Sequence, residues 1–526
     1  MSPFRRRAGA AFVLALVAFG RGAAAAPAPN PTGEELPTAE EILARSKIVA
    51  ATDRRPETER EVWDVRLASL EGTSSTVRRG ADVAQTTELG PFRTARGTRR
   101  GEKWRQNENG ETILERAEPS QTERIATQTV TRVREPVDAF EVTTAYASGH
   151  VTRSFYDVRS YELVRLERVA AGHTTHTTYE DFRTDARGRT RPWHYFGGDE
   201  RPDTEFDYRL VRDDLDAAVT ESDVEIPHDR RVLVDFPAGV AAVKLPAHIV
   251  DGRIYVRVTI GGRGLDFVLD SGSAAISIDE RVARDLKLSV YGRITQTVAG
   301  SFASGRVVVP DVAIGPLAMH DVVMHTVPYS APEGHSIRAV GLLGYDFLAS
   351  TALKIDYPSG DVEAARPGTL AFPPSATPLE VRLGSGTPVA RATIGEATGD
   401  DFIIDTGAAF SYVIFQRFAR LHRETLEDRS RENYGNGVGG SFGYRPIETT
   451  KVALGAWSLE QSGGVEALAP NAFGFDNQDG LIGAEILRRF TVYFDYAANR
   501  VGFSPSPAAL QSRSITPILS EAGAKP

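Results

Sequence analysis

The sequence predicts a mainly β protein whose C-terminal half is duplicated and whose N-terminal half is a separate β-rich region. From about residue 61 to residue 224, short runs rich in Thr, Val, Arg and Tyr alternate with Gly, Asp and Asn, as in REVWDVRLASLEG. This period-two pattern with turn signals is typical of antiparallel sheets. From about residue 246 the runs are more apolar, and two stretches repeat the same landmarks in the same order. At 526 residues the chain is also too long for one hydrophobic core.

Composition limits the chemistry that the chain can perform. The net charge of −9 is mild for this length and argues against a nucleic-acid partner. Cys is absent, which excludes disulfides, thiol nucleophiles and cysteine-based metal sites. No G-x-S-x-G, H-E-x-x-H or phosphate-loop motif is present, so serine hydrolases, zincins and nucleotide enzymes have no support.

The first residues predict export. Arg5, Arg6 and Arg7 precede the apolar run AFVLALVAFG and the small residues AAAAPA, which is the order of a secretory signal peptide, residues 1–26. The run is too short for a stable membrane span, and an uncleaved short anchor is the alternative. No other stretch is apolar enough to cross a membrane. We therefore expect a periplasmic or extracellular protein.

The rest of the chain divides by composition. Thr38 and Glu41 form a capping box at the start of TAEEILARSKIVAAT, which predicts a helix. The helix opens a β-rich accessory domain, residues 38–235, with a sheet that we expect to curve like half a barrel. Two lobes follow, residues 240–366 and 379–505, joined by a Pro-rich linker, residues 367–378, and followed by a tail, residues 506–526.

The two lobes share three landmarks. LDFVLDSGSAAISI in the first matches DFIIDTGAAFSYVI in the second, so Asp270 and Asp405 each follow an apolar strand and precede Ser/Thr-Gly. Further on, GLLGYDFL matches GLIGAEIL, with Gly344 74 positions after Asp270 and Gly483 78 positions after Asp405. Between them lie VAGSFASG and GVGGSFGY. A chance Asp-Ser-Gly turn would not be repeated at this spacing.

These paired motifs resemble the aspartic peptidases, with two retropepsin-like lobes in one chain, as in a family of bacterial exported aspartyl proteases. The resemblance covers about residues 245–505 and says nothing of residues 38–235. It implies two acid-protease β-barrel-like lobes and an aspartic endopeptidase with Asp270 and Asp405 as the catalytic dyad that holds the nucleophilic water. Two carboxyls sharing one proton can deprotonate water and protonate a peptide carbonyl, and their like charges keep that proton bound.

The resemblance also assigns supporting residues. Gly272 and Gly407 allow backbone N–H groups to approach the carboxylates, and the hydroxyls of Ser271 and Thr406 are implied to link the lobes beneath the dyad. Ser273 could bond the outer oxygen of Asp270, whereas Ala408, at the matching place, has no hydroxyl. The crossings under the active loops would be closed by Gly344 and Gly483.

The Gly-rich tips are candidate flaps. Pepsin-like enzymes have one flap and retroviral-type dimers have two, and the repeat favours two, with exposed Phe side chains that contact substrate. The alternative is a pair of ordinary Gly-rich hairpins. The flap residues are Gly300, Ser301, Phe302, Gly440, Ser441 and Phe442.

Other candidates have structural interpretations. Asp356 and Asp495 also recur, but each lies on a hairpin after the short helix. His173 and His176 alternate with Thr as on a solvated strand, although metal binding is possible in principle. FRTARGTRRGEKWR reads as an exposed Arg-rich strand pair, or else as an inhibitory segment over the dyad.

We therefore expect an enzyme that acts on peptide or protein substrates, with no metal or cofactor, as a monomer whose two lobes build one site. One alternative is a non-catalytic protein that binds peptides or envelope ligands on the same scaffold. Another places the activity in the N-terminal domain, as a carrier of apolar ligands. Both aspartates and both glycines are retained, which disfavours a pure binding protein.

Overall fold

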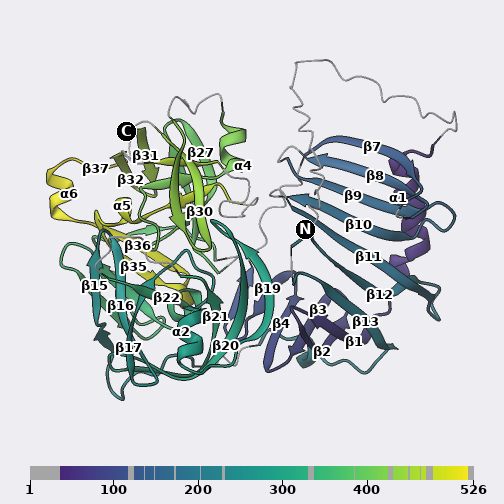
Figure 1. The fold of residues 1–526 in the computed structure, drawn as a ribbon, viewed down its shortest axis with the longest axis horizontal. Helices are drawn as coiled ribbons and strands as arrows, with labels where there is room; N and C mark the ends of the chain where they lie inside the picture. Colours follow the sequence, from purple (N-terminus) through teal and green to yellow (C-terminus); the bar gives the residue numbers. More distant parts are fainter. Residues whose placement is uncertain are drawn as a thin grey trace, which may run out of the picture.

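The computed structural model describes residues 36–115, 124–135, 137–146, 149–170, 173–201, 203–227, 232–329, 337–383, 386–423, 431–447, 450–461, 464–468 and 478–518. The expected signal peptide lies outside the described residues. The fold is mainly β, as predicted, and its described strands form four sheets (Figure 1). One sheet belongs to the N-terminal region, and the other three form the part of the chain that carries the repeat.

The N-terminal region is a single antiparallel sheet of 13 strands in the order β6-β5-β4-β3-β2-β1-β13-β12-β11-β10-β9-β8-β7. In this sheet each strand pairs with the strand that comes before or after it in the sequence, and β1 also pairs with β13. The strands are β1 Thr58–Leu67, β2 Leu70–Arg79, β3 Asp82–Leu89, β4 Phe92–Arg99, β5 Glu102–Gln106, β6 Thr112–Glu115, β7 Ile125–Val133, β8 Ala139–Tyr146, β9 Val151–Asp157, β10 Leu163–Ala170, β11 His173–Thr184, β12 Thr190–Gly198 and β13 Phe206–Leu215.

A helix covers part of this sheet. Helix α1, Ala39–Ala50, begins at the predicted capping box: the Thr38 hydroxyl accepts from the Glu41 N–H, and the Glu41 carboxylate accepts from the Thr38 N–H. Ile42 packs against Phe140 and neighbouring apolar side chains of the sheet. In Figure 1 strands β7–β12 lie at the right and β1–β4 turn below them toward the rest of the molecule, so that the sheet bends.

The first lobe is an eight-stranded sheet with two short helices, α2 Glu280–Asp285 and α3 Tyr345–Ala349. Its strands, in the order β15-β16-β17-β22-β18-β21-β20-β19, are β15 Ala247–Val250, β16 Arg253–Ile260, β17 Arg263–Leu269, β18 Ser277–Asp279, β19 Tyr291–Thr297, β20 Ser301–Ile314, β21 Leu317–Val327 and β22 Ala339–Leu343.

The second lobe repeats this plan with ten strands and helices α4 Gln416–Leu421 and α5 Ala484–Leu487. Its strands, in the order β29-β30-β33-β28-β34-β27-β26-β31-β32-β37, are β26 Val389–Ile394, β27 Ala397–Ile404, β28 Tyr412–Ile414, β29 Asn433–Gly437, β30 Gly440–Pro446, β31 Thr450–Leu454, β32 Trp457–Gln461, β33 Val465–Ala467, β34 Gly480–Ile482 and β37 Ile515–Pro517.

A six-stranded sheet belongs to both lobes. It contains, in order, β14 Ala242–Lys244, β24 Asp361–Ala365, β23 Ala352–Asp356, β35 Phe490–Asp495, β36 Arg500–Pro505 and β25 Thr377–Leu379. The expected linker is therefore not all linker, because its end forms β25. The residues that we expected to be a tail are also partly ordered, since helix α6, Pro507–Gln511, leads into β37, which pairs with β32.

One hydrophobic cluster runs through both lobes and reaches the N-terminal region. Ile113 of β6 belongs to it, as do Leu233, Val234 and Phe236. These last residues straddle the boundary that composition placed at residue 235, because their burial is supplied by the lobes. The hydrophobic core of the lobes therefore continues across this boundary, and the N-terminal sheet packs against the first lobe.

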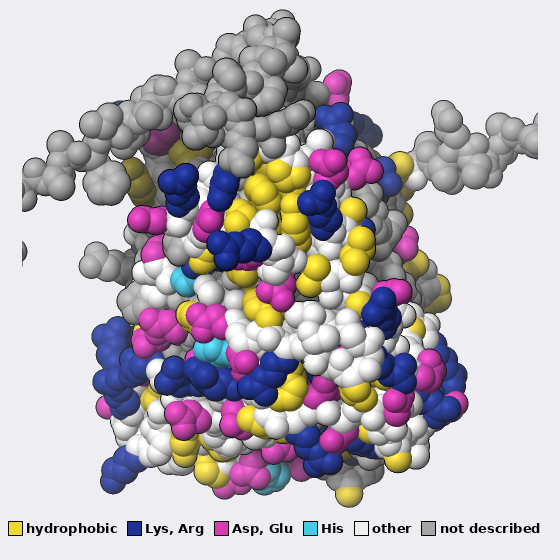
Figure 2. Space-filling model, turned by 90° about the vertical axis from the view of Figure 1, so that its right-hand side faces the viewer, with side chains coloured by type: hydrophobic (Ala, Val, Ile, Leu, Met, Phe, Trp, Pro, Cys, Tyr) yellow, Lys and Arg dark blue, Asp and Glu magenta, His cyan; other side chains and the backbone are white. Residues whose placement is uncertain are grey.

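The side of the molecule that carries the N-terminal sheet shows no single dominant charge. In Figure 2 basic and acidic side chains are interspersed across the lower part of this face, and a group of hydrophobic side chains lies above them. Several ion pairs join neighbouring strands here, such as Arg153 with Glu141 and Glu167. Within the described ranges, no helix is both long and apolar enough to cross a membrane.

Candidate active site

The two Asp-Ser/Thr-Gly loops are built by the same strand arrangement. Strand β17 runs parallel to β22, with Leu269 beside Leu343, and the Asp270 N–H donates to the Leu343 carbonyl at 3.0 Å. In the second lobe β27 runs parallel to β34, with Ile404 beside Ile482. Parallel pairing ends both strands of a pair at one edge, so each aspartate emerges beside its Gly motif.

Both loops require glycine because the carboxyl of the opposite loop leaves no room for a side chain. A Cβ on Gly272 would lie 2.5 Å from the Asp405 Cγ, and a Cβ on Gly407 would lie 2.5 Å from the Asp270 Cγ. Each carboxyl therefore lies against the backbone of the opposite loop. The Gly272 N–H donates to Asp270 at 2.9 Å, and the Gly407 N–H donates to Asp405 at 2.8 Å.

The second pair of glycines, Gly344 and Gly483, lies directly against the backbone of the two Asp-Ser/Thr-Gly loops. A Cβ on Gly344 would lie 2.6 Å from the carbonyl oxygen of Ser273, and one on Gly483 would lie 2.9 Å from that of Ala408. Any side chain here would displace the active loop. The predicted correspondence between Gly344 and Gly483 is therefore matched by equivalent contacts in the two lobes.

Four buried hydrogen bonds link the lobes beneath the carboxyls. The Ser271 hydroxyl donates to the Ile404 carbonyl at 2.6 Å and accepts from the Thr406 N–H at 3.0 Å. The Thr406 hydroxyl donates to the Leu269 carbonyl at 2.8 Å and accepts from the Ser271 N–H at 3.0 Å. This reciprocal arrangement places the two hydroxyls where the resemblance implied them.

The two carboxyls interact directly, and their environments differ. Burial and the charge of Asp405 raise the pKa of Asp270 well above its ordinary value. Burial also raises the pKa of Asp405, but the N–H groups of Gly407 and Ala408, the hydrogen bond with Asp270 and the charge of Arg253 oppose that rise. The pair therefore holds a proton, and its titration belongs to the pair rather than to either carboxyl alone.

The expectation for Ser273 was wrong. Its hydroxyl donates to the Ala275 carbonyl at 2.8 Å rather than to Asp270, because the chain turns toward β18 directly after the loop. The Ser273 backbone N–H donates to the main-chain carbonyl of Asp270 at 3.2 Å and, with the Gly272 N–H, opposes the rise in the pKa of Asp270. Ala408 likewise contributes its N–H, which donates to Asp405 at 3.1 Å. At this position the backbone of each loop faces its carboxyl.

The two Gly-rich tips are hairpins that meet each other. The first flap is β19, β20 and their turn, and the second flap is β29, β30 and their turn. The Ala299 N–H donates to the Val438 carbonyl at 3.1 Å, and a Cβ on Gly437 would lie 2.8 Å from the Ala299 Cβ. Gly300 and Ser301 lie at the first tip, and Gly440 and Ser441 at the second.

The two flap phenylalanines are not exposed as expected. Phe302 is half-buried, and Phe442 is only 3% exposed because it packs with Phe410, Val413 and other side chains of the second lobe. Both rings line the cleft in which the dyad lies. The expected Phe-lined cover is present, but Phe442 belongs to the core of its lobe.

The dyad lies in a cleft of about 790 Å³. Its second-lobe side is mainly apolar and includes Ile403, Phe410 and Leu481. Sequence reasoning missed two groups of lining residues. One is Arg253 of β16, whose Nε donates to the Gly407 carbonyl at 3.3 Å. The other comes from the N-terminal sheet and comprises Arg105, Asn107, Glu108, Asn109, Ile113 and Arg201.

A signal for Arg253 was available in the repeat. Arg253 stands six residues before the Thr-Ile-Gly that both halves share, and the same place in the second half is occupied by Thr387. A comparison of the two halves for differences, rather than for matches, would have singled it out. The N-terminal lining residues had no comparable signal, because the contact depends on how the sheet packs against the first lobe.

The remaining candidates from the sequence make contacts that stabilise the fold and lie outside the dyad. Asp495 is buried, accepts from the Gly368 N–H at 3.0 Å and pairs with Arg500 at 2.8 Å. Asp356 accepts from the Thr491 hydroxyl at 3.4 Å across the shared sheet. His173 contacts Glu200 at 3.1 Å. The Arg-rich run forms β4 and β5, although within it Arg99 is buried against Asp82 and Glu225.

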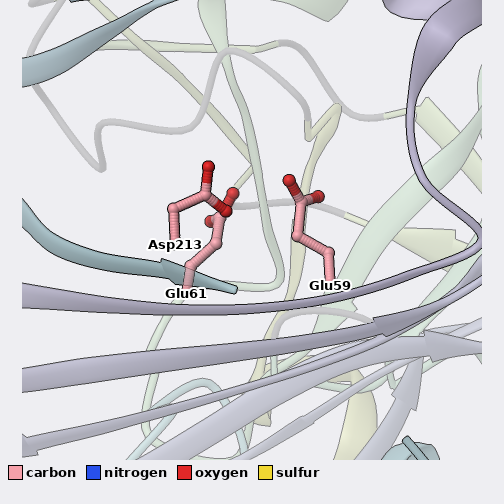
Figure 3. A group of neighbouring side chains, drawn as sticks. All are labelled: Glu59, Glu61 and Asp213. Carbon is pink, nitrogen blue, oxygen red and sulfur yellow. The ribbon is translucent and has the colours of Figure 1, made fainter. Parts of the chain in front are cut away.

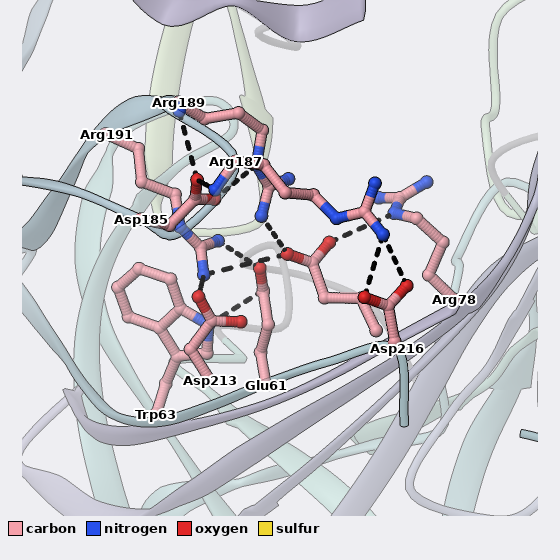
Figure 4. Close-up of polar contacts among 10 residues, drawn as sticks. Glu61, Trp63, Arg78, Asp185, Arg187, Arg189, Arg191, Asp213 and Asp216 are labelled. Carbon is pink, nitrogen blue, oxygen red and sulfur yellow. Dashed lines mark hydrogen bonds and ion pairs between the residues drawn. The ribbon is translucent and has the colours of Figure 1, made fainter. Parts of the chain in front are cut away.

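A second group of carboxylates lies on the N-terminal sheet. Ligand atoms of Glu59, Glu61 and Asp213 lie within 4.8 Å of one another (Figure 3). Guanidinium groups occupy the same space: Arg189 bonds Glu59 at 2.6 Å, and Arg191 pairs with Glu61 and Asp213 (Figure 4). Because protein cations already neutralise these acids, the cluster is an ion-pair network of the sheet.

Comparison with known proteins supports a peptidase-like first lobe. A family model described as aspartyl protease matches residues 256–347. The search of curated proteins gave no match.

Three solved structures illustrate the likenesses found. Basic 7S globulin from soybean is 14% identical, with 52% of this chain and 96% of that chain covered and a TM-score of 0.31. An aspartic proteinase from Irpex lacteus is 15% identical, with coverage of 51% and 98% and a TM-score of 0.33. A LolA superfamily protein from Nitrosomonas europaea is 11% identical, with coverage of 36% and 98% and a TM-score of 0.26.

The likeness of the chain to aspartyl proteases lies in the segment that the family model matches and in the site itself. Residues 256–347 hold Asp270 and Gly344 and are similar to aspartyl proteases. The second loop, with Asp405, brings another copy of the same motif to the same cleft.

Proposed function

We propose that the protein is an exported aspartic endopeptidase that hydrolyses peptide bonds in peptide or protein substrates. The observation that carries the proposal is the facing pair Asp270 and Asp405, each held against the glycine of the opposite loop. Export is supported by the predicted signal peptide. A protein that only binds peptides has no need to hold two carboxyls together, since their mutual repulsion and desolvation cost stability.

In this proposal the shared proton defines the roles of the two aspartates. Ionised Asp405 accepts a proton from the nucleophilic water as that water attacks the scissile carbonyl carbon, and protonated Asp270 donates its proton to the carbonyl oxygen. The C–N bond then breaks as the carbonyl re-forms: the proton held by Asp405 passes to the leaving amine, and Asp270 takes its proton back. The cross-lobe hydrogen bonds of Ser271 and Thr406 hold the loops at a fixed separation. The flaps cover the cleft and exclude bulk water, which strengthens the electrostatic interactions inside it.

The test is replacement of each carboxyl by an amide. Asp270→Asn and Asp405→Asn should each reduce kcat/KM on a peptide library by about a thousandfold or more, because the dyad works as a unit. Circular dichroism should be unchanged, and Asp356→Asn serves as a matched control that keeps its activity. Turnover of either dyad variant at the wild-type rate would refute the proposal, and an inert wild-type protein that still binds peptides would favour the binding alternative.

A further inference from the structure

The N-terminal sheet contacts the first flap at its base. The Arg293 N–H donates to the Ala68 carbonyl, in the turn between β1 and β2, at 2.7 Å. The ring of Tyr291 meets Phe92 of β4 edge-on, with centroids 5.8 Å apart. Between them, a Cβ on Gly292 would lie 3.0 Å from the Ala68 carbonyl oxygen. The start of β19 therefore contacts the β1–β2 turn through its backbone and the first residue of β4 through the Tyr291 ring, which is 37% exposed.

A second contact lies near the tip of the same flap. Arg201, in the loop between β12 and β13, donates from Nη1 to the Thr297 hydroxyl at 3.2 Å. Its Nη2 donates to the Asp199 carboxylate at 2.5 Å, and its backbone N–H donates to the same residue at 2.8 Å. Because Asp199 fixes the guanidinium, Arg201 is held at the last residue of β19, where it also lines the cleft.

A third contact holds the strands behind the flap. In the loop between β5 and β6, the Asn109 amide group donates to the Val323 carbonyl at 3.0 Å and accepts from its N–H at 2.9 Å. The neighbouring Glu108 pairs with Arg306 of β20 at 2.8 Å. Asn109 is buried, so this pairing is protected from water. Both β20 and β21 are thus tied to the N-terminal sheet.

The second flap is held differently. Strand β30 pairs with β33, and Phe442 packs against Phe410, so the base of this flap is supported from within the second lobe. Only its tip contacts the first lobe among the contacts described, through Val438. Its residues 433–446 include five glycines, whereas residues 291–305 of the first flap include three. Glycine increases the conformational freedom of the backbone. The two flaps have matching places in the repeat but unequal restraints.

We propose that the N-terminal sheet fixes the first flap over the cleft through Phe92 and Arg201, so that the second flap is the one that moves when a peptide enters. Arg201 and Phe92 are then positioning residues, and the N-terminal sheet is a working part of the peptidase rather than a detachable segment. The proposal rests on the proposed function only in taking the occupant of the cleft to be a peptide.

Hydrogen–deuterium exchange of the full chain tests the restraint without requiring catalysis. Amides of residues 291–305 should exchange at least about tenfold more slowly than those of residues 433–446. In the double variant Phe92→Ala with Arg201→Gln, exchange of residues 291–305 should accelerate about tenfold while the rest of the first lobe is unchanged. Arg187→Gln is the matched control, because it removes an exposed ion pair of the same sheet with Asp216.

Kinetics add a second measurement. The double variant should raise KM for a peptide substrate about tenfold and change kcat little, because a loose flap weakens binding before it affects the dyad. Faster exchange in the first flap than in the second, or an unchanged first flap in the double variant, would overturn the proposal. These exchange outcomes hold even if the dyad variants above show that the protein is not a peptidase.

Discussion

At the scale of single residues, Arg253 makes the two halves of the dyad unequal. It bonds the Gly407 carbonyl at 3.3 Å, its charge lowers the pKa of Asp405, and the second lobe has the uncharged Thr387 at the matching place. The duplicated loops alone would give two carboxyls in similar surroundings. Burial raises the pKa of Asp405, backbone N–H groups of its own loop and the hydrogen bond with Asp270 oppose that rise, and the Arg253 cation adds to their effect from one side of the dyad only.

Removing this cation should move the pH profile in a defined direction. In Arg253→Met the pKa of Asp405 should rise, so the loss of kcat/KM on the acidic side should begin at higher pH. Arg257→Met, four residues along β16 and paired with Asp266 at 3.2 Å, is the control. An acidic limb that stays in place in Arg253→Met, or moves equally in Arg257→Met, would contradict this role.

The buried carboxyl of Asp270 should also make stability depend on pH. Its folded-state pKa is raised by burial and by Asp405, so its contribution to stability is full below the ordinary carboxyl pKa of about 4 and is lost as pH rises through the folded value. Asp270→Asn should therefore raise Tm at neutral pH, with each kcal/mol worth roughly 2–4 °C.

That gain should vanish below pH of about 4, where the carboxyl is protonated in both the folded and the unfolded chain. Thermal melts of wild type and Asp270→Asn at both pH values provide the measurement. A Tm difference that is the same at the two pH values would show that the substitution acts through packing instead of through charge.

At the scale of elements, the contact between the flap tips can be fixed by an engineered disulfide. Ala299 and Gly437 face each other closely, and the chain has no Cys of its own. In Ala299→Cys with Gly437→Cys, a small separation of the tips brings the Cβ atoms to the roughly 3.5–4.5 Å of a disulfide. The oxidised variant should lose nearly all activity on peptides because the cleft cannot open, and a reductant should restore it.

Each single Cys variant controls for the substitution itself and should stay active under oxidising conditions. The extent of cross-linking can be followed by mass spectrometry of the flap peptides before and after reduction. Full activity in the completely cross-linked variant would mean that substrates reach the dyad without separation of the tips.

The elements also show where sequence reasoning succeeded and where it stopped. The capping box at Thr38 predicted helix α1 because a cap depends on neighbouring residues. The repeat predicted the matching surroundings of Gly344 and Gly483 because the same motifs recur in the same order at nearly the same spacing. The burial of Phe442 depends on side chains of β28 and β33, far away in the sequence. The Ser273 hydroxyl donates to the Ala275 carbonyl, and the Asp-Ser-Gly motif does not determine which acceptor this hydroxyl bonds.

At the scale of the whole molecule, one chain supplies both halves of the site. Ser271 and Thr406 bond across the lobes within the same chain, and the shared six-stranded sheet holds the lobes together. We expect a monomer to be active. Mixing Asp270→Asn with Asp405→Asn should restore no activity, whereas recovery on mixing, checked by size-exclusion chromatography for dimers, would indicate a site assembled between chains.

The position of the N-terminal sheet could not be predicted from composition. Its strands were recognisable from their alternation, but their packing against the first lobe depends on single long-range pairs such as Asn109 with Val323. The loop that carries Asn109 contains no motif. The same limit explains why Leu233 and Val234 seemed to belong to the first region although their burial comes from the lobes.

The shared six-stranded sheet has a consequence for how the chain matures. Strand β23 pairs with β35, as Ile355 does with Val492, and β25 pairs with β36, which ends at Pro505. Pairings between such distant residues form late, because a long loop must close first. A chain threaded through a membrane from its N-terminus would therefore release Asp270 and Asp405 before the sheet shared by the two lobes has formed. On the proposed function, topology alone would keep the new chain inactive on peptides until almost its entire length has emerged.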